Sequence, residues 1–213
     1  MKIKNILKIT TYVVITLISI ACDEDIFIDS RDGQKYRLTT IGKQTWMAEN
    51  LNYQMDDRWC YNDEPNNCKV YGRLYSYQAA QKACPTGWHL PNATEWQILD
   101  DNTNERTNLK TKSGWGKDEK TEKNLNGLDP FGFSAVPGGS RYPNGKYNHE
   151  GEIAEFWQYN DKTFGSTFWI QGPEIVVIFD DGPDPDLINT SDTSNVENIV
   201  YDSEGHSIRC IKD

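Results

Sequence analysis

The sequence is poor in basic residues and in histidine. Its 213 residues include 22 Lys and Arg but 32 Asp and Glu, which gives a formal net charge of -10 at pH 7. So acidic a chain repels the phosphate backbone of nucleic acids, and we expect no nucleic-acid partner. The 3 histidines leave little scope for a histidine-rich metal site or for general-base catalysis by histidine.

Long apolar runs are also scarce. The run at residues 9–20 is too short to span a bilayer comfortably. It follows three lysines and ends at the small residue Ala21, which is the arrangement of a secretory signal peptide. We therefore expect residues 1–21 to be a signal peptide, the alternative being an uncleaved N-terminal anchor. With 37% hydrophobic and 12% aromatic residues, the chain can still build a packed core.

Cys22 follows the signal peptide directly. A cysteine after Ile-Ala at this point resembles the lipobox of bacterial lipoproteins, in which the cysteine is acylated and becomes the first mature residue. Ser19 stands where leucine is more usual. The acidic residues 23–25 resemble the surface-export signal of Bacteroidetes-type lipoproteins; the alternative is a solvated linker. We expect an exported protein held by lipid on the outer membrane, at the cell surface, with residues 22–30 as an acidic tether.

Removal of residues 1–21 makes the chain still more acidic. The mature chain has 19 basic and 32 acidic residues, a formal net charge of -13. Anionic lipid would not attract such a domain, so the acyl group would provide the attachment to the membrane.

Four further cysteines remain for an oxidising compartment: Cys60, Cys68, Cys84 and Cys210. They allow two disulfides in three connectivities. Pairing of Cys60 with Cys68 would close a short loop rich in turn formers, which leaves Cys84 to pair with Cys210. No CxxC spacing occurs, so we expect neither a redox site nor a cysteine metal site.

The periodicity of the chain indicates a single α+β domain. Residues 35–41 alternate as a half-buried strand does, and the turn formers Gly42-Lys43 lead into a second strand at residues 44–47. Residues 74–84 read as a short amphipathic helix, and Asn92 with Glu95 forms a capping-box start for a second helix. Residues 100–126 are polar and read as a helix end and an exposed loop. Short antiparallel strands are expected at residues 133–136, 154–157, 168–170, 175–179 and 207–211.

A series of ordered motifs resembles the Fibrobacter succinogenes major paralogous domain. The motifs are residues 46–51 (WMAENL), 71–75 (YGRLY), 84–91 (CPTGWHLP), 132–135 (GFSA), 137–139 (PGG) and 207–213 (SIRCIKD). The match begins near residue 29, so we take residues 31–213 as the domain. The family is known mainly from exported and lipid-anchored proteins without an established activity.

The segment His89-Leu90-Pro91, followed by Glu95-Trp96, is similar to the C-type-lectin-like fold, including its formylglycine-generating-enzyme branch. The resemblance implies an α+β domain with two short helices, many short antiparallel strands and two disulfides. It also implies that the chain ends meet and that a disulfide links a helix to the last strand.

No coherent catalytic set is evident in the sequence. Formylglycine-type oxidation needs a reactive cysteine pair in the C-terminal part of the domain, where only Cys210 lies. Glu95, Glu152 and Glu155 could serve as the paired carboxylates of a glycosidase, but the sequence does not fix their separation. We therefore expect a protein that is not an enzyme, and rank a polysaccharide-acting hydrolase last.

Two groups of residues are candidates for ligand binding. Trp115 and Tyr142 stand in loop-like contexts, where their rings could stack on sugars. A run of carboxylates could hold calcium on a turn, the alternative being an acidic surface loop; its members are Asp180, Asp181, Asp184 and Asp186. No other cofactor is expected.

The sequence thus favours a cell-surface lipoprotein with a C-type-lectin-like domain. We expect it to bind or adhere to an extracellular partner, a polysaccharide or a protein. The alternative is an envelope structural or assembly module without a small-molecule ligand.

Overall fold

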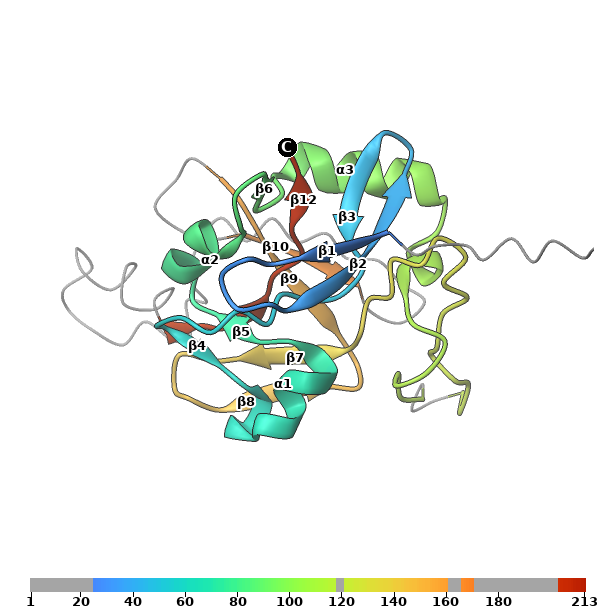
Figure 1. Ribbon diagram of the computed structural model, residues 1–213. Helices are drawn as coiled ribbons and strands as arrows, with labels where there is room; N and C mark the ends of the chain where they lie inside the picture. Colours follow the sequence, from blue (N-terminus) through green and yellow to red (C-terminus); the bar gives the residue numbers. More distant parts are fainter. Residues whose placement is uncertain (1–24, 118–120, 161–165, 171–202) are drawn as a thin grey trace, which may run out of the picture.

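Two five-stranded sheets organise the part of the chain that the structure describes (Figure 1), residues 25–117, 121–160, 166–170 and 203–213 of a computed structural model. The first sheet has the order β1 (Ile26–Ile28), β2 (Lys35–Ile41), β3 (Gln44–Met47), β12 (Ile211–Lys212) and β6 (Trp88–His89). The second has the order β10 (Ser166–Ile170), β9 (Ala154–Gln158), β11 (His206–Ser207), β5 (Leu74–Tyr75) and β4 (Arg58–Trp59). A separate hairpin pairs β7 (Gly138–Arg141) with β8 (Tyr147–Glu150). The strands pair antiparallel except β9 with β11.

In the described ranges, three α-helices accompany these sheets: α1 (Pro65–Tyr71), α2 (Tyr77–Ala83) and α3 (Ala93–Thr103). Two 3₁₀ segments, η1 (Tyr61–Asp63) and η2 (Arg106–Leu109), extend them. Figure 1 shows α3 along the top, beside β3 and β12, and α1 at the opposite end, near β7 and β8. The α+β class is confirmed, but the prediction of two helices is wrong. The missed helix is α1, because the turn formers around Pro65 also suit a first helical turn. A backbone N–H at that position has no partner within the helix, so proline, which has no N–H, is tolerated there.

Local signals placed the first hairpin and the third helix correctly. The register pairs Ile41 with Gln44, so Gly42 and Lys43 form the two-residue turn between β2 and β3. At the start of α3, the Asn92 side chain accepts a hydrogen bond from the Glu95 backbone and the Glu95 carboxylate accepts one from the Asn92 backbone. This reciprocal pair is the predicted capping box.

The domain begins earlier than predicted. Residues 22–30 were expected to be a tether, but Ile26–Ile28 pairs with β2 as an edge strand. Asp29 is fully buried and forms an ion pair with Arg31, with 2.6 Å between Oδ2 and Nη2. The strand forms because Phe27, between two exposed isoleucines, packs its ring against Trp88.

Other element boundaries also differ from the prediction. Leu74 and Tyr75 form β5, and the helix starts only after Ser76, whose side chain accepts a hydrogen bond from the backbone of Ala79. Residues 133–136 are not a strand, since only Ala135 forms an isolated bridge. The predicted strand at 207–211 splits into β11 and β12, which lie in different sheets. The predicted strand at 175–179 lies outside the described residues.

Aromatic rings fill the interior in two clusters. One surrounds Tyr75 and Trp157, and the other surrounds Trp46, Trp96 and Phe133. The Trp96 ring stacks on Phe168 with 4.3 Å between centroids, and Trp96 is 1% exposed. Most tryptophans of the described chain therefore serve the core.

The two disulfides have the predicted pairing. Cys60 bonds to Cys68, and Cys84, at the end of α2, bonds to Cys210, directly before β12. The second disulfide encloses a sequence separation of 126 residues. Since β1 and β12 lie in one sheet, both ends of the described domain belong to the same structural unit. Among the described residues, no helix has both the length and the hydropathy needed to cross a membrane.

Candidate functional site

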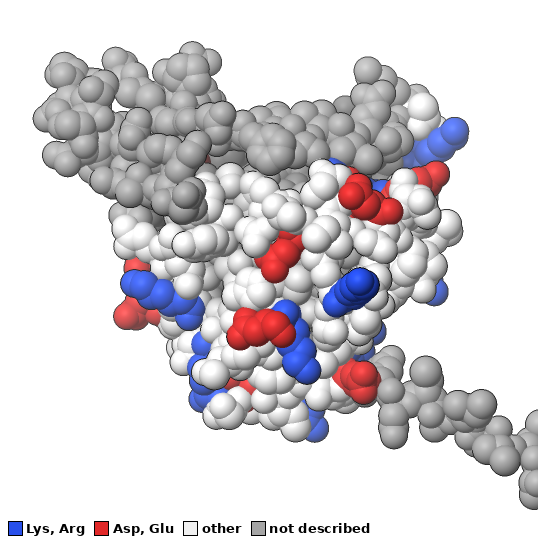
Figure 2. All heavy atoms as spheres, turned by 90° about the horizontal axis from the view of Figure 1, so that it is seen from above, with Lys and Arg blue, Asp and Glu red and all other residues white. Residues whose placement is uncertain are grey.

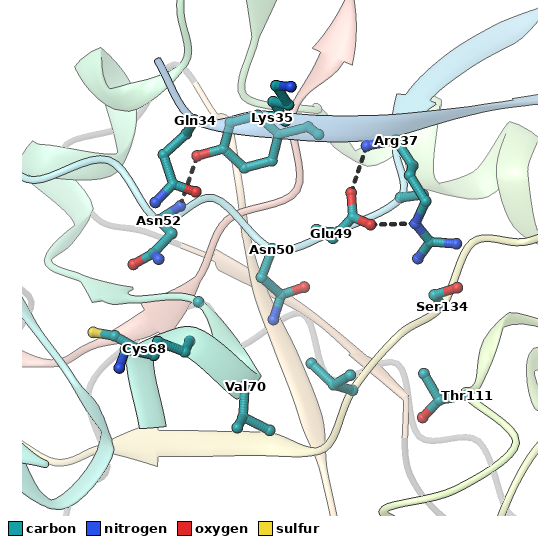
Figure 3. A pocket seen from close by; sticks show the side chains of 15 residues that line it. Gln34, Lys35, Arg37, Glu49, Asn50, Asn52, Cys68, Val70, Thr111 and Ser134 are labelled. Atoms are coloured by element: carbon teal, nitrogen blue, oxygen red, sulfur yellow. Dashed lines mark hydrogen bonds and ion pairs between the residues drawn. The ribbon is translucent and has the colours of Figure 1, made fainter. Parts of the chain in front are cut away.

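A polar cavity of about 410 Å³ lies between β2, the segment that follows β3, and α1 (Figure 3). Its volume falls in the range of about 300–1,000 Å³ that is usual for small-molecule sites. The residues that line it are Gln34, Lys35, Tyr36, Arg37, Ala48, Glu49, Asn50, Asn52, Cys68, Lys69, Val70, Gly72, Thr111, Ser134 and Val136.

An ion pair occupies the upper wall. Glu49 accepts a hydrogen bond from the backbone N–H of Arg37 at 2.7 Å, and its other oxygen accepts one from Arg37 Nε. Figure 3 shows the two side chains facing each other along this wall. Because both are about two-fifths exposed, the pair contributes at most about 1 kcal/mol to stability. Arg37 nevertheless contacts both oxygens of the Glu49 carboxylate, one through its backbone N–H and one through its side chain.

Asn50 forms the rear wall of the cavity, and hydrogen bonds to residues behind this wall fix its side chain. Its Nδ2 donates to the carbonyl of Tyr71 at 2.8 Å and to Ser207 Oγ at 3.2 Å, and its Oδ1 accepts from Arg209 Nη2 at 2.7 Å. Arg209 is fully buried and also donates to the carbonyls of Met47, Phe133 and Ser134. Burial lowers the pKa of Arg209 to about 9, although the Glu49 and Asp129 carboxylates act in the opposite direction. The wall is therefore rigid and backed by a cation.

Gly72 lets the end of α1 approach this wall. Its φ of +74° is in the left-handed region, which favours glycine. A Cβ at this position would lie 2.7 Å from Asn50 Cβ and 2.9 Å from the carbonyl oxygen of Leu51. The glycine of the Tyr71-Gly72-Arg73 motif is thus required both by its backbone angle and by space.

Side-chain amides and hydroxyls stand at the two ends of the cavity. Figure 3 places Gln34 and Asn52 together at one end, and Thr111 and Ser134 at the other. Asn52 Oδ1 is buried and has no hydrogen-bond partner among the residues that the structure describes. The hydroxyls donate within the protein, Thr111 to the carbonyl of Ser113 and Ser134 to Asp129. Hydroxyl oxygens retain acceptor capacity when they donate, so the ends of the cavity can bind further polar groups.

The cavity has no catalytic set of a familiar kind among its lining residues. None of them is a histidine, and Cys68 is held in a disulfide. Both oxygens of the Glu49 carboxylate accept hydrogen bonds from Arg37. The arrangement is suited to binding a polar molecule.

Trp115 does not lie on the surface. It is 5% exposed, and its Nε1 donates to Thr111 Oγ1 at 3.0 Å. Lys110 places its ammonium over the ring, 3.9 Å from the centroid. The prediction of an exposed platform at Trp115 is therefore wrong. The loop folds back over the indole, held by a hydrogen bond from the Trp115 backbone to Asn126 Oδ1.

Tyr142 lies at the turn between β7 and β8 and is 36% exposed. Its hydroxyl is 3.2 Å from His149 Nε2. It does not line the cavity, and its role in ligand binding stays a prediction.

Cys22 and the acidic run lie outside the described residues. The run consists of Asp180, Asp181, Asp184 and Asp186. Within the described ranges, no group of three or more His, Cys, Asp or Glu side chains could hold a metal ion. The calcium prediction is neither supported nor contradicted by that finding.

Each of the three candidate glutamates contacts a different histidine. Glu95 lies 2.8 Å from His89, Glu152 lies 3.3 Å from His149, and Glu155 lies 3.2 Å from His206; these are N–O distances. His89 also contacts Asp213 at 2.7 Å, which ties the chain terminus to the start of α3. Each glutamate thus has its own histidine partner, and the three pairs share no residue.

The pair of Glu155 and His206 is a buried feature that sequence reasoning missed. Burial would lower the pKa of His206, but the Glu155 and Glu204 carboxylates outweigh burial and raise it to about 9. For Glu155, burial would raise the pKa, but His206 and hydrogen bonds from Thr167 and Ser140 lower it. The residues come from β7, β9, β10 and β11, so no local pattern could have revealed the cluster.

These observations define an α+β domain that is held by two disulfides and carries a polar cavity. The chain belongs to the family described as the Fibrobacter succinogenes major domain, whose sequence model matches residues 39–212. No curated protein and no solved structure matches the chain. The family name describes no activity, so the site itself must supply the hypothesis of function.

Proposed function

We propose that this protein is a lipid-anchored binding module of the cell surface that holds a saccharide in the polar cavity and is not an enzyme. One observation carries the proposal: a cavity of about 410 Å³ is lined by amide and hydroxyl side chains on a wall fixed by the Asn50–Arg209 network. Sugars present many hydroxyls, and amides such as those of Gln34 and Asn52 can donate to them and accept from them.

The C-type-lectin-like architecture is part of this proposal. Three features support it: the terminal strands β1 and β12 share a sheet, Cys84 at the end of α2 bonds to Cys210, and α3 starts beside the His89 motif. Folds of this kind host many unrelated roles, so the cavity rather than the fold supports the choice of ligand.

The surface charge agrees with an extracellular partner that is not a nucleic acid. On the face seen in Figure 2, acidic and basic side chains are interspersed, with no continuous basic patch. The net charge of -10 has the same sign as a phosphate backbone.

A cavity-blocking variant tests saccharide binding. Val70, on α1 at the cavity, is 60% exposed, so Val70→Trp adds bulk at the mouth with little cost to folding. A panel of cell-wall oligosaccharides, titrated with and without calcium, should yield at least one ligand of the mature protein. We expect Val70→Trp to weaken its binding by about tenfold or more, a change of about 1.4 kcal/mol in binding free energy. Val70→Thr, of nearly the same size, is the matched control and should bind as the wild type does.

Two results would contradict this assignment. If the folded protein binds none of the panel, the envelope assembly module becomes the better hypothesis. If Val70→Trp binds as well as Val70→Thr, the ligand lies elsewhere on the molecule.

Attachment through Cys22 is tested by fractionation. We expect Cys22→Ala to move the protein from the membrane fraction to the soluble fraction, because acyl chains, and not the charge of the mature chain, provide the attachment. The control is Asp25→Asn, which keeps the cysteine. Unchanged fractionation of Cys22→Ala would refute the lipoprotein assignment.

One observation favours the alternative function, an envelope assembly module without a small-molecule ligand. The edge strand β1 exposes Ile26 by 52% and Ile28 by 55%, and an edge strand with apolar side chains can pair with another chain. Under this alternative, purified mature protein would form oligomers that Ile28→Lys abolishes, without binding saccharides.

A further inference from the structure

The charge of the cavity is opposite to that of the protein. The whole chain has a formal net charge of -10, yet the 15 residues that line the cavity include three cationic side chains and one carboxylate. The cations are Lys35, Arg37 and Lys69, and the carboxylate is Glu49. A ligand at this place therefore meets a local excess of positive charge.

Ion pairing leaves two of these cations uncompensated. Glu49 is engaged by Arg37 through both carboxylate oxygens, so these two charges cancel locally. Lys35 and Lys69 are exposed and form no ion pair with any of the described residues. Among the described residues, the Lys69 ammonium has one polar contact, to a neutral group, Asn66 Oδ1 at 3.2 Å.

The two lysines come from opposite walls. Lys35 belongs to β2 and Lys69 to α1. Figure 3 shows Lys35 on the upper wall, and Cys68 and Val70, which flank Lys69 in the sequence, on the lower wall. The cavity is thus lined by a lysine from each of two elements that are separate in the fold.

A third cation lies behind the cavity. The fully buried Arg209 donates to Asn50 Oδ1 and to the carbonyl of Ser134, two residues that line the cavity. No ion pair involves Arg209 in the described part of the chain. A buried charge is poorly screened, so it adds to the positive potential inside the cavity.

We propose that the saccharide held in this cavity is anionic, with its acidic group attracted by Lys35 and Lys69 and its hydroxyls bound by the polar side chains that line the cavity. The inference rests on the proposed function, since it specifies the ligand of the same site. A carboxylate and a sulfate ester would both satisfy the two ammonium groups.

Matched oligosaccharides test the inference on the mature full-length domain. The probes are trigalacturonate with its methyl ester, and a sulfated dextran oligosaccharide with its unsulfated parent. In calorimetric titration, we expect the charged member of at least one pair to bind at least tenfold more tightly than its neutral counterpart. We expect its affinity to fall between 50 mM and 200 mM salt, because the lysines are solvent-exposed. The pair that shows the preference identifies a carboxylate or a sulfate as the acidic group.

Charge reversal identifies the groups responsible. Lys35→Glu and Lys69→Glu should each weaken binding of the charged probe by about tenfold, because each replaces an attraction by a repulsion that salt partly screens. Lys43→Glu, at the exposed turn between β2 and β3 and outside the cavity, is the matched control and should change the affinity less than twofold. Circular dichroism of each variant confirms that it is folded.

The outcomes separate this inference from the proposed function. One outcome is that neutral probes bind as well as charged ones, and that Val70→Trp weakens this binding whereas Lys35→Glu and Lys69→Glu do not. The cavity then binds saccharides, and the inference of an anionic ligand is overturned. An equal loss in Lys43→Glu would also overturn it, since the attraction would then come from overall charge. If no probe binds, the proposed function fails with it.

Discussion

At the scale of single residues, Gly72 offers a direct test of how the cavity is built. Gly72→Ala would combine a left-handed backbone angle with a Cβ 2.9 Å from the carbonyl oxygen of Leu51. We expect a loss of about 2–4 kcal/mol in the free energy of unfolding, from backbone strain and overpacking together, measured by urea denaturation. The matched control is Gly87→Ala, because Gly87 has a φ of +84° but no atom within 4 Å of an added Cβ. Equal losses in the two variants would show that the close approach of α1 contributes nothing.

Residue-scale predictions from the sequence held where the determinant is local. Asn92 and Glu95 form the predicted capping box because both partners lie within one helical turn. Trp115 was misjudged because its burial depends on a loop that returns to it from residue 126. The buried role of Arg209 has no local signal either, because a charged residue is ordinarily exposed and here four acceptors from distant segments satisfy it.

At the scale of elements, the two disulfides stabilise the fold to different extents. The chain-entropy model attributes about 5 kcal/mol to the Cys84–Cys210 disulfide and about 2–3 kcal/mol to Cys60–Cys68, because their sequence separations are 126 and 8. We expect the double variant Cys84→Ala/Cys210→Ala to lose about 2 kcal/mol more unfolding free energy than Cys60→Ala/Cys68→Ala. Urea denaturation of both under non-reducing conditions measures the difference, with each double variant serving as the control for the other. Equal losses would mean that the unfolded chain is not constrained as this model assumes.

Element boundaries were predictable where a strand and its partner are adjacent in sequence. The hairpin of β2 and β3 was predicted in full, because alternation and a two-residue turn specify it. The segment at 207–211 was predicted as one strand but divides between two sheets, since β11 pairs with β5 and β9, whereas β12 pairs with β3 and β6. Partners from distant parts of the chain decide such boundaries. The cavity was not predicted for the same reason, as its walls come from five separate segments.

At the scale of the whole molecule, every histidine is matched with carboxylates. His89 contacts Glu95 and Asp213, and His206 contacts Glu155 and Glu204. Burial would lower the pKa of His89, but its two hydrogen-bonded carboxylates raise it, in the same direction as for His206. The raised pKa of His206 makes the stability of the sheet around β11 dependent on the protonation of this ring.

This dependence predicts that the domain loses stability as the pH rises. A histidine whose pKa is about 9 in the folded state and 6.5 in the unfolded chain contributes fully below pH 6.5 and loses its contribution as the pH approaches 9. We expect the unfolding free energy to fall by about 3 kcal/mol over this range, since each pKa unit corresponds to about 1.4 kcal/mol. Urea denaturation between pH 6 and pH 9.5 measures the decline. His206→Gln should remove most of it, whereas the surface variant His149→Gln should preserve it. A wild-type stability that stays constant or increases from pH 6.5 to pH 9 would mean that the Glu155–His206 pair is not ionised in the folded protein.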